Sequence, residues 1–457
     1  MKVRLSVSLA VMALVLAGSN SPSGPQRADK GRRAIFSPQT ETRAMVQTPG
    51  PGPNGLAQSP TMGWMSWQVF RCEINCTAHP AGCVNEQLYR ETADSMASLG
   101  YLDAGYDQIS IDDCWEDRHG RDSEGHLVPD PTRFPRGMAA LGSYIHAKGF
   151  NFGTYSDEGT ATCCGYPASK GYEAVDASTF AHWGVDYLKL DGCNNDQAGY
   201  AKGYPAMGTA LQASGRNIAF SCSWPAYLGD NESEKPFADM IDAGCNSWRN
   251  WEDIQCTWAS VSSIISHWAE YGHVMAPFAG PGHWHDMDML VIGAGCLSHD
   301  EEQTQMAIWA ISASPLIMGN DVRRVPKQSR ELLLNRAAIA VSQDRLGRMG
   351  TLLPGFNASS KTQVWARPLS GGDVAVALFN KADKGAVSII LDFASVGLQG
   401  QVSVFDIWAQ ARIGIFYGRF VADAVPPHGT AFLKLTVASA ASAAATASEG
   451  SPSMLIL

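Results

Sequence analysis

The sequence lacks any run of about 18 or more consecutive apolar residues, the length that a helix needs to span a bilayer. It also lacks an excess of positive charge, because 34 Lys and Arg stand against 44 Asp and Glu and give a formal net charge of -10. Nucleic acids and anionic membranes attract basic surfaces, so an acidic chain is a poor partner for either. We therefore expect neither a membrane-spanning segment nor a nucleic-acid partner.

The N-terminal segment has the pattern of a targeting sequence. Lys2 and Arg4 precede a mainly apolar run over residues 5–16, and small residues follow it. This pattern predicts a secretory signal peptide over residues 1–18. Residues 19–58 are rich in Pro, Ser, Gly and Gln without periodicity, which indicates a disordered leader. We expect a protein of the secretory pathway, either lysosomal or extracellular.

Cysteine content agrees with this compartment. The chain has 11 cysteines, a number that fits an oxidising environment but leaves at least one without a partner in the chain. Three Asn-x-Ser/Thr sequons, which are candidate glycosylation sites, lie at Asn75, Asn231 and Asn357.

From about residue 59 onward, short strand-like segments alternate with amphipathic helical segments, as in a parallel sheet with helical crossovers. The predicted strands are 61–67, 107–112, 151–155, 186–191, 218–223, 246–249, 274–277 and 316–319. Eight such units predict a closed (β/α)8 barrel, a TIM barrel, over residues 59–341. In such a barrel the active site lies at the C-terminal ends of the strands.

The pattern changes after residue 341. Short β-branched or aromatic segments separated by Gly, Asn and Pro turns predict an antiparallel β-sandwich domain over residues 342–437. The predicted segments are 363–366, 374–379, 388–392, 401–406, 414–419 and 429–435. Residues 438–457, mainly Ala and Ser, are expected to form a low-complexity tail.

The fourth predicted strand carries polar groups on one face. Alternation places Tyr187, Lys189 and Asp191 on the same side of the strand. The Lys189 ammonium should keep the Asp191 carboxylate ionised, as a nucleophile or an electrostatic stabiliser requires. An ion pair that only ends the strand explains these residues equally well.

Acids also follow other predicted strands. Asp112 and Asp113 end the second strand and suit the recognition of sugar hydroxyls; metal ligation is the weaker alternative, because no histidine or further acid stands at ligand spacing nearby. Arg249 and Asp253 follow the sixth strand, either as a catalytic acid beside an arginine or as a structural salt bridge.

Residues 280–290 contain His283, His285 and Asp286, which could be read as metal ligands. No second histidine pair stands at another strand end, so we expect no metal. Five tryptophans at strand ends either stack on sugar rings or pack in the core: Trp64, Trp67, Trp115, Trp224 and Trp284.

Together these residues resemble glycoside hydrolase family 27, the retaining α-galactosidases and α-N-acetylgalactosaminidases. The motifs that carry the resemblance are 62–64, 112–115, 187–193, 245–253 and 280–290. The resemblance implies a (β/α)8 barrel followed by an antiparallel β domain, with no cofactor. It implies that Asp191 is the nucleophile and Asp253 the general acid/base, and we expect a higher pKa for Asp253 than for Asp191.

The resemblance also implies the residues that contact the substrate: Trp67, Asp112, Asp113, Tyr155, Cys163, Lys189, Cys193, Ser223, Ala226, Tyr227, Arg249, Asp288 and Met289. It implies disulfides that pair Cys72 with Cys114, Cys76 with Cys83, Cys163 with Cys193, and Cys222 with Cys245. Cys164, Cys256 and Cys296 stay unassigned. The sequence departs from the family's Trp-Asn-Asp-Pro-Asp motif at His285 and Met287.

The segment 221–227 bears on which sugar is cut. Galactose-specific relatives carry Glu and Leu where this chain has Ser223 and Ala226, so the smaller pair leaves room for a 2-acetamido group. We predict removal of terminal α-linked N-acetylgalactosamine, and more weakly of α-galactose, from glycans. Three alternatives stay open: an α-galactosidase, a catalytically inactive sugar-binding protein, and a metal-dependent barrel hydrolase. A homodimer is an open question.

Overall fold

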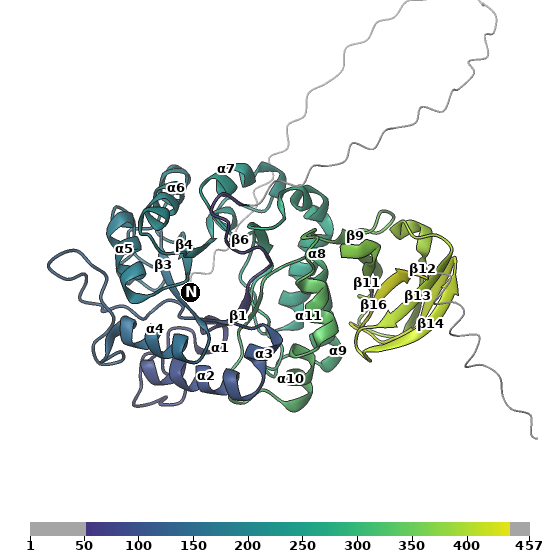
Figure 1. Ribbon diagram of the computed structural model, residues 1–457, viewed down its shortest axis with the longest axis horizontal. Helices are drawn as coiled ribbons and strands as arrows, with labels where there is room; N and C mark the ends of the chain where they lie inside the picture. Colours follow the sequence, from purple (N-terminus) through teal and green to yellow (C-terminus); the bar gives the residue numbers. More distant parts are fainter. Residues whose placement is uncertain (1–51, 439–457) are drawn as a thin grey trace, which may run out of the picture. The chain divides into compact units, whose positions relative to one another are not determined.

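The computed structural model in Figure 1 describes residues 52–438. The predicted signal peptide and nearly all of the predicted tail lie outside the described residues. Residues 52–58, the last part of the predicted leader, are among the described residues. They are ordered, whereas the sequence led us to expect disorder. Gly52 donates its backbone N–H to Pro281 O, and Asn54 Nδ2 donates to Gly244 O and to Asn246 Oδ1. These contacts fix residues 52–58 against the barrel.

Eight parallel strands form the barrel, with the order β7-β6-β5-β4-β3-β2-β1-β8. They are β1 (Met62–Met65), β2 (Gln108–Ser110), β3 (Asn151–Asp157), β4 (Tyr187–Asp191), β5 (Ala219–Cys222), β6 (Ser247–Arg249), β7 (Trp284–Asp286) and β8 (Leu316–Met318). A parallel bridge between Leu290 and Met318 closes the ring between the segment after β7 and β8. The predicted fold class is confirmed.

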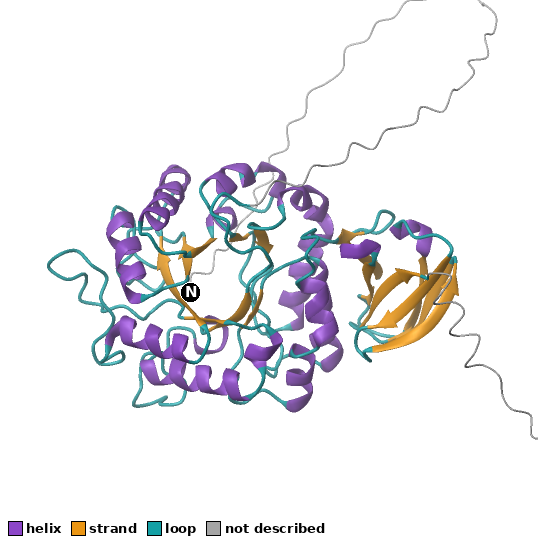
Figure 2. Ribbon diagram, viewed as in Figure 1, coloured by secondary structure: helices purple, strands orange, loops and turns teal. Residues whose placement is uncertain are grey.

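The helices lie outside the ring of strands (Figure 2). They are α1 (Trp67–Phe70), α2 (Glu86–Ser98), α3 (Tyr101–Ala104), α4 (Gly137–Ala147), α5 (Glu173–Trp183), α6 (Gln197–Ala213), α7 (Phe237–Asp242), α8 (Trp258–Met275), α9 (His299–Ile311), α10 (Lys327–Leu333) and α11 (Arg336–Ser342). The 3₁₀ helices are η1 (Trp224–Tyr227), η2 (Glu232–Glu234), η3 (Ala276–Phe278), η4 (Ser370–Gly372) and η5 (Phe393–Val396). Asp196 and Thr257 accept backbone N–H groups at the starts of α6 and α8, and Ser298 forms a capping box at the start of α9.

The predicted seventh strand is wrong. Residues 274–277 form the end of α8 and the start of η3, because this helix continues to Met275. A short apolar run cannot be told from a buried helix segment by periodicity alone. The observed β7 carries His285 and Asp286, whose buried polar side chains hide the strand pattern.

The C-terminal domain contains two antiparallel sheets. The larger has the order β14-β13-β16-β11-β10-β9 and consists of β9 (Thr351–Leu352), β10 (Thr362–Pro368), β11 (Val374–Asn380), β13 (Gln401–Asp406), β14 (Ala411–Tyr417) and β16 (Thr430–Val437). The smaller pairs β12 (Val387–Asp392) with β15 (Arg419–Val425). Predicted segment 414–419 spans two strands, because a turn at Gly418 separates β14 from β15.

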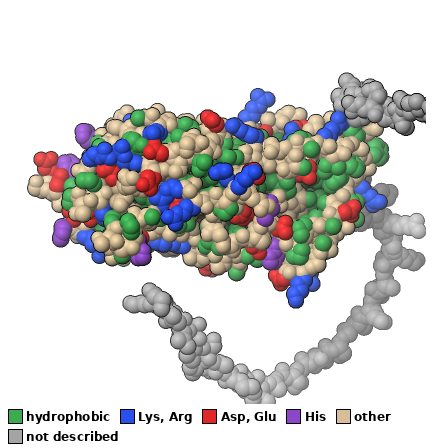
Figure 3. Space-filling view, turned by 90° about the horizontal axis from the view of Figure 1, so that it is seen from below, with side chains coloured by type: hydrophobic (Ala, Val, Ile, Leu, Met, Phe, Trp, Pro, Cys, Tyr) green, Lys and Arg blue, Asp and Glu red, His purple; other side chains and the backbone are tan. Residues whose placement is uncertain are grey.

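Hydrogen bonds join the barrel to the β domain. The buried Arg367 on β10 donates from Nη1 to Ala310 O at 2.6 Å and to Ser342 O at 3.1 Å. Thr304 on α9 donates to His428 O at 2.5 Å. On the face seen in Figure 3, acidic and basic side chains are interspersed. Within residues 52–438, no helix has the length and apolar character that crossing a membrane requires.

Candidate active site

A cavity of about 290 Å³ opens at the C-terminal ends of the barrel strands, where (β/α)8 enzymes place their active sites. Its lining residues are Trp67, Asp112, Asp113, Tyr155, Cys163, Lys189, Asp191, Cys193, Ser223, Ala226, Tyr227, Arg249, Trp251, Glu252 and Asp253. Strand ends far apart in the sequence thus bring together both candidate catalytic acids and all but two of the predicted binding residues.

Asp191 ends β4, and its carboxylate is held from several sides. Tyr227 donates its hydroxyl to Oδ1 at 2.7 Å, and Tyr155 donates to Oδ2 at 3.4 Å. The backbone N–H of Gly192 also donates to Oδ1. The side chain is 17% exposed, so it can still meet a ligand in the cavity. These contacts fix the orientation of the Asp191 carboxylate at the edge of the cavity.

Lys189 bridges two carboxylates. Its Nζ lies 2.8 Å from Asp112 Oδ2 and 4.0 Å from Asp191 Oδ2, so the pair with Asp112 is the closer one. Burial alone would lower the pKa of Lys189, but Asp112 and Asp191 together raise it above its ordinary value. The ammonium therefore stays charged beside the candidate nucleophile.

Asp112 and Asp113 present oxygen acceptors to the cavity. Asp113 accepts the backbone N–H of Cys114 on Oδ1 at 2.6 Å and that of Cys164 on Oδ2 at 3.0 Å. Burial raises the pKa of both Asp112 and Asp113. Fixed, buried carboxyl groups of this kind suit hydrogen bonds with the hydroxyls of a sugar.

Asp253 is well exposed at the site, with 65% of its side chain accessible. Arg249 Nη2 donates to Asp253 Oδ1 at 3.0 Å and to Glu252 O at 2.9 Å. The positive charge of Arg249 lowers the pKa of Asp253 below its ordinary value. The sequence led us to expect a higher pKa for Asp253 than for Asp191, and the contact with Arg249 acts against that expectation.

Asp288 and Met289, both predicted to contact the substrate, are absent from the cavity lining. Asp288 adopts a φ of 73°, and its Oδ2 accepts the N–H of Ile254 at 2.7 Å and lies 3.0 Å from Arg249 Nη1. Met289 is buried. In this structure Asp288 therefore supports Arg249 and the segment beyond Asp253 rather than lining the pocket.

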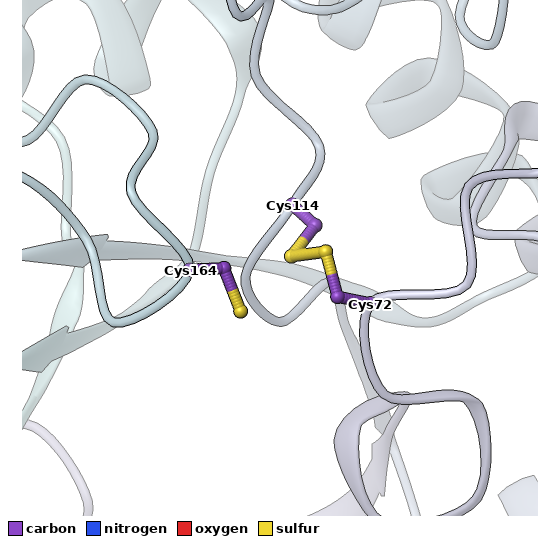
Figure 4. A group of neighbouring side chains, drawn as sticks. All are labelled: Cys72, Cys114 and Cys164. Carbon is purple, nitrogen blue, oxygen red and sulfur yellow. A yellow bond between two sulfur atoms is a disulfide. The ribbon is translucent and has the colours of Figure 1, made fainter. Parts of the chain in front are cut away.

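Five disulfides are present: Cys72–Cys114, Cys76–Cys83, Cys163–Cys193, Cys222–Cys245 and Cys256–Cys296. The first four are the pairs that the resemblance implies, and the fifth joins two cysteines that were unassigned. Among the described residues only Cys164 keeps a free thiol. Figure 4 shows it beside the Cys72–Cys114 bridge, with the three sulfur atoms within 4.8 Å of one another.

The histidines of the 280–290 motif are buried, and His285 contacts Phe237 of α7 and Met275 of α8. His285 accepts the indole N–H of Trp248 on Nδ1 at 2.9 Å, and its Nε2 lies 2.9 Å from Met275 O. Burial lowers the pKa of His285 to about 4, so the ring is neutral. Both ring nitrogens are occupied by the protein, and we assign His285 a structural role.

The five tryptophans predicted at strand ends divide into one that lines the cavity and four in the core. Of the five proposed from the sequence, only Trp67 lines the cavity, and the other four are buried in the core. Trp251 and Glu252 line the cavity but were missed. The sequence signal that could have found them is their position directly before Asp253. A loop that brings a candidate catalytic acid to a site also brings the residues next to that acid.

The three sequons differ in exposure. Asn75 and Asn357 are exposed, whereas Asn231 is half-buried and donates from Nδ2 to Glu234 Oε1 at 2.7 Å.

A parallel barrel whose strand ends bring five carboxyl side chains, a lysine, two tyrosines and an arginine around one cavity is the architecture of a barrel glycoside hydrolase. The comparison with known proteins makes this specific. Residues 59–344 match the family model described as alpha galactosidase A, and residues 359–435 match the alpha galactosidase C-terminal beta sandwich domain. The chain belongs to this family, glycoside hydrolase family 27, and is a glycoside hydrolase.

Relatives in this family carry two names. The chain is 46% identical to alpha-N-acetylgalactosaminidase of Gallus gallus over 72% of this chain and 80% of the relative. It is also 46% identical to human alpha-galactosidase A, over 75% of this chain and 79% of the relative. The crystal structure of alpha-galactosidase I from Mortierella vinacea superposes with a TM-score of 0.76 at 32% identity, covering 84% of this chain and 99% of that one.

Proposed function

We propose that the protein is a retaining exo-glycosidase that removes terminal α-linked N-acetylgalactosamine, and more weakly α-linked galactose, from glycoconjugates. The observation that carries this proposal is the presence of Asp191, Asp253, Ser223 and Ala226 around one cavity. Its volume lies near the lower end of the range of about 300–1,000 Å³ for small-molecule sites, which suits one terminal sugar.

The proposed reaction is the double displacement of a retaining glycosidase, with Asp191 and Asp253 as its two carboxyl groups. Asp191 attacks the anomeric carbon while Asp253 gives its proton to the leaving oxygen, and a covalent glycosyl-enzyme forms. Asp253 then takes a proton from water, which displaces Asp191 and releases the sugar with its configuration retained. Lys189 and Tyr227 stabilise the negative charge of Asp191 before attack and after release. The proposed reaction uses no cofactor.

The preference for the 2-acetamido sugar rests on the turn after β5. Ser223 N donates to Leu190 O, and Ala226 N donates to Ser223 O, so the two small side chains are held at the cavity wall. The Ser223 hydroxyl can donate to the acetamido carbonyl, and Ala226 can pack against its methyl group. Galactose also fits, because a pocket rejects an oversized group better than an undersized one.

The alternative is an α-galactosidase that prefers galactose. It has equal support from the names of the relatives, since both names occur at the same identity. Ser223 and Ala226 are the residues that favour the acetamido sugar.

The double substitution Ser223→Glu with Ala226→Leu tests the specificity. It should suppress the kcat/KM for a nitrophenyl α-N-acetylgalactosaminide and raise the kcat/KM for the α-galactoside relative to it. A matched control, Ser143→Glu with Ala140→Leu on the exposed surface of α4, should leave the ratio of the two unchanged. If the unsubstituted enzyme cleaves α-galactosides and leaves α-N-acetylgalactosaminides intact, the proposed preference is wrong.

We further propose a lysosomal or extracellular location, supported by the five disulfides.

The three sequons are proposed glycosylation sites, and the domain limits 59–341 and 342–437 are proposed from the sequence. We also propose a homodimer, because the β domain exposes large apolar side chains: Ile390, Ile413, Tyr417, Val421 and Val437.

A further inference from the structure

We propose that Trp251 forms a binding site for the leaving group, and that this site takes an uncharged second sugar ring stacked on the indole. The inference rests on the proposed function. If Asp253 protonates the leaving oxygen, the leaving group must lie on the side of the cavity where Asp253 stands.

The first step concerns position. Trp251 stands two residues before Asp253 and lines the same cavity. The acid must reach the oxygen that joins the terminal sugar to its leaving group, within about 2.6–3.2 Å. The leaving group therefore starts at the glycosidic oxygen beside Asp253. We infer that it extends along the same loop, past Trp251.

The second step concerns the indole, which is fixed although it is only half-buried. Its ring stacks on His267 with centroids 4.4 Å apart and an interplanar angle of 3°. Its Nε1–H donates to Asp230 Oδ1 at 3.0 Å. One face and one edge of the indole are thus held by the protein, while the side chain still lines the cavity.

The third step concerns what holds His267. Its Nε2 lies 2.7 Å from Glu232 Oε1, and Glu232 also accepts from Lys235 Nζ at 2.7 Å and from Asn250 Nδ2 at 2.9 Å. All four of these side chains are buried. A ring that is already held in place loses little side-chain entropy when a ligand binds to it. This buried network therefore favours a ligand-binding role for Trp251.

The chemistry of the surroundings selects the ligand. A flat aromatic face packs against the C–H side of a sugar ring. The carboxylates of Asp230 and Glu252 flank Trp251, and Glu252 is exposed at the cavity. Carboxylates accept hydrogen bonds from hydroxyls and repel anions. The structure therefore favours a neutral sugar over a sulfated or otherwise acidic one as the leaving group.

The experiment compares two substrates of each variant. One is a disaccharide in which N-acetylgalactosamine is α-linked to galactose, and the other is methyl α-N-acetylgalactosaminide. Trp251→Ala should lower the ratio of kcat/KM for the disaccharide to kcat/KM for the methyl glycoside by about three- to tenfold, the range expected for loss of one aromatic stacking contact. Trp251→Phe should restore most of the ratio, because it keeps a flat ring.

Trp408→Ala is the matched control, because Trp408 is a half-buried tryptophan of the β domain, outside the cavity lining. It should leave the ratio unchanged, and thermal unfolding of each variant checks that the protein is folded. An unchanged ratio in folded Trp251→Ala, with both substrates still cleaved, overturns the stacking site alone. If the unsubstituted enzyme cleaves neither α-N-acetylgalactosaminides nor α-galactosides, the proposed function fails and the site falls with it.

A second arm tests the charge selection. Sulfation of the galactose ring should lower the kcat/KM of the disaccharide, and Glu252→Gln should recover part of that loss. A sulfated disaccharide that is cleaved as well as the neutral one contradicts the neutral-sugar assignment.

Discussion

At the scale of single residues, the contact between Arg249 and Asp253 bears on how the proposed activity depends on pH. Asp253 must be protonated to act as a donor, and Arg249 lowers its pKa. The protonated fraction therefore falls as the pH rises from the acidic range, and catalysis on substrates with poor leaving groups should fall with it.

We predict that Arg249→Gln moves the alkaline limb of the kcat/KM profile to higher pH. Removing the guanidinium removes the main cause of the lowered pKa of Asp253, so the donor keeps its proton longer. The size of kcat/KM should also drop, because Arg249 lines the cavity. Arg348→Gln, at an exposed arginine, is the control. An alkaline limb at the same pH in Arg249→Gln and in the unsubstituted enzyme would show that another group sets it.

At the scale of elements, the loop after β6 is fastened at both ends. Arg249 bonds the carbonyl of Glu252 near its start, and the Cys256–Cys296 disulfide ties its end to the segment after β7. The bridge closes a stretch with a sequence separation of 40 residues. Asp253, the proposed general acid, thus stands on a loop that is held at both ends.

Removal of this bridge should cost stability and activity together. Replacing Cys256 and Cys296 by Ala should lower the free energy of unfolding by about 2–4 kcal/mol, the usual contribution of a disulfide. The kcat should fall as well, because Asp253 is less well positioned. Cys164→Ala removes a thiol without removing a bridge and serves as the control. Denaturant unfolding that gives equal free energies for the double variant and the control would contradict this role.

The elements also show what sequence patterns can and cannot predict. Alternating segments around Asp112 and Asp191 predicted strands that end in acids, because the period of a strand is local information. The prediction of the seventh strand failed for two reasons. The observed β7 contains the buried polar residues His285 and Asp286, and the apolar run before it belongs to the end of α8. The Cys256–Cys296 pair and the place of Trp251 in the cavity depend on how distant loops meet, which no local pattern contains.

At the scale of the whole molecule, several buried carboxyls determine how stability depends on pH. Burial raises the pKa of Asp157 to about 9, of Glu158 to about 8 and of Asp286 to about 6. Below about pH 4 these groups are protonated in both the folded and the unfolded chain. As the pH rises toward the folded values, only the folded chain keeps the protons, so the free energy of unfolding decreases.

We predict a higher thermal unfolding midpoint at pH 5 than at pH 8. Glu158→Gln should reduce that difference, because an amide cannot ionise and Glu158 Oε2 has no hydrogen-bond partner among the described residues. Glu331→Gln, on the exposed surface of α10, should leave the difference unchanged. A midpoint that rises from pH 5 to pH 8 would show that groups other than these carboxyls dominate.

The central claim is that one cavity holds a terminal N-acetylgalactosamine between Asp191, Asp253 and the small pair Ser223 and Ala226. A crystal structure of the Asp191→Ala variant with an α-N-acetylgalactosaminide bound tests it most directly. We expect the anomeric carbon to face residue 191, the glycosidic oxygen to lie beside Asp253, and the acetamido group to lie against Ser223 and Ala226. A sugar bound with its acetamido group turned away from these two residues, or bound outside this cavity, would contradict the account.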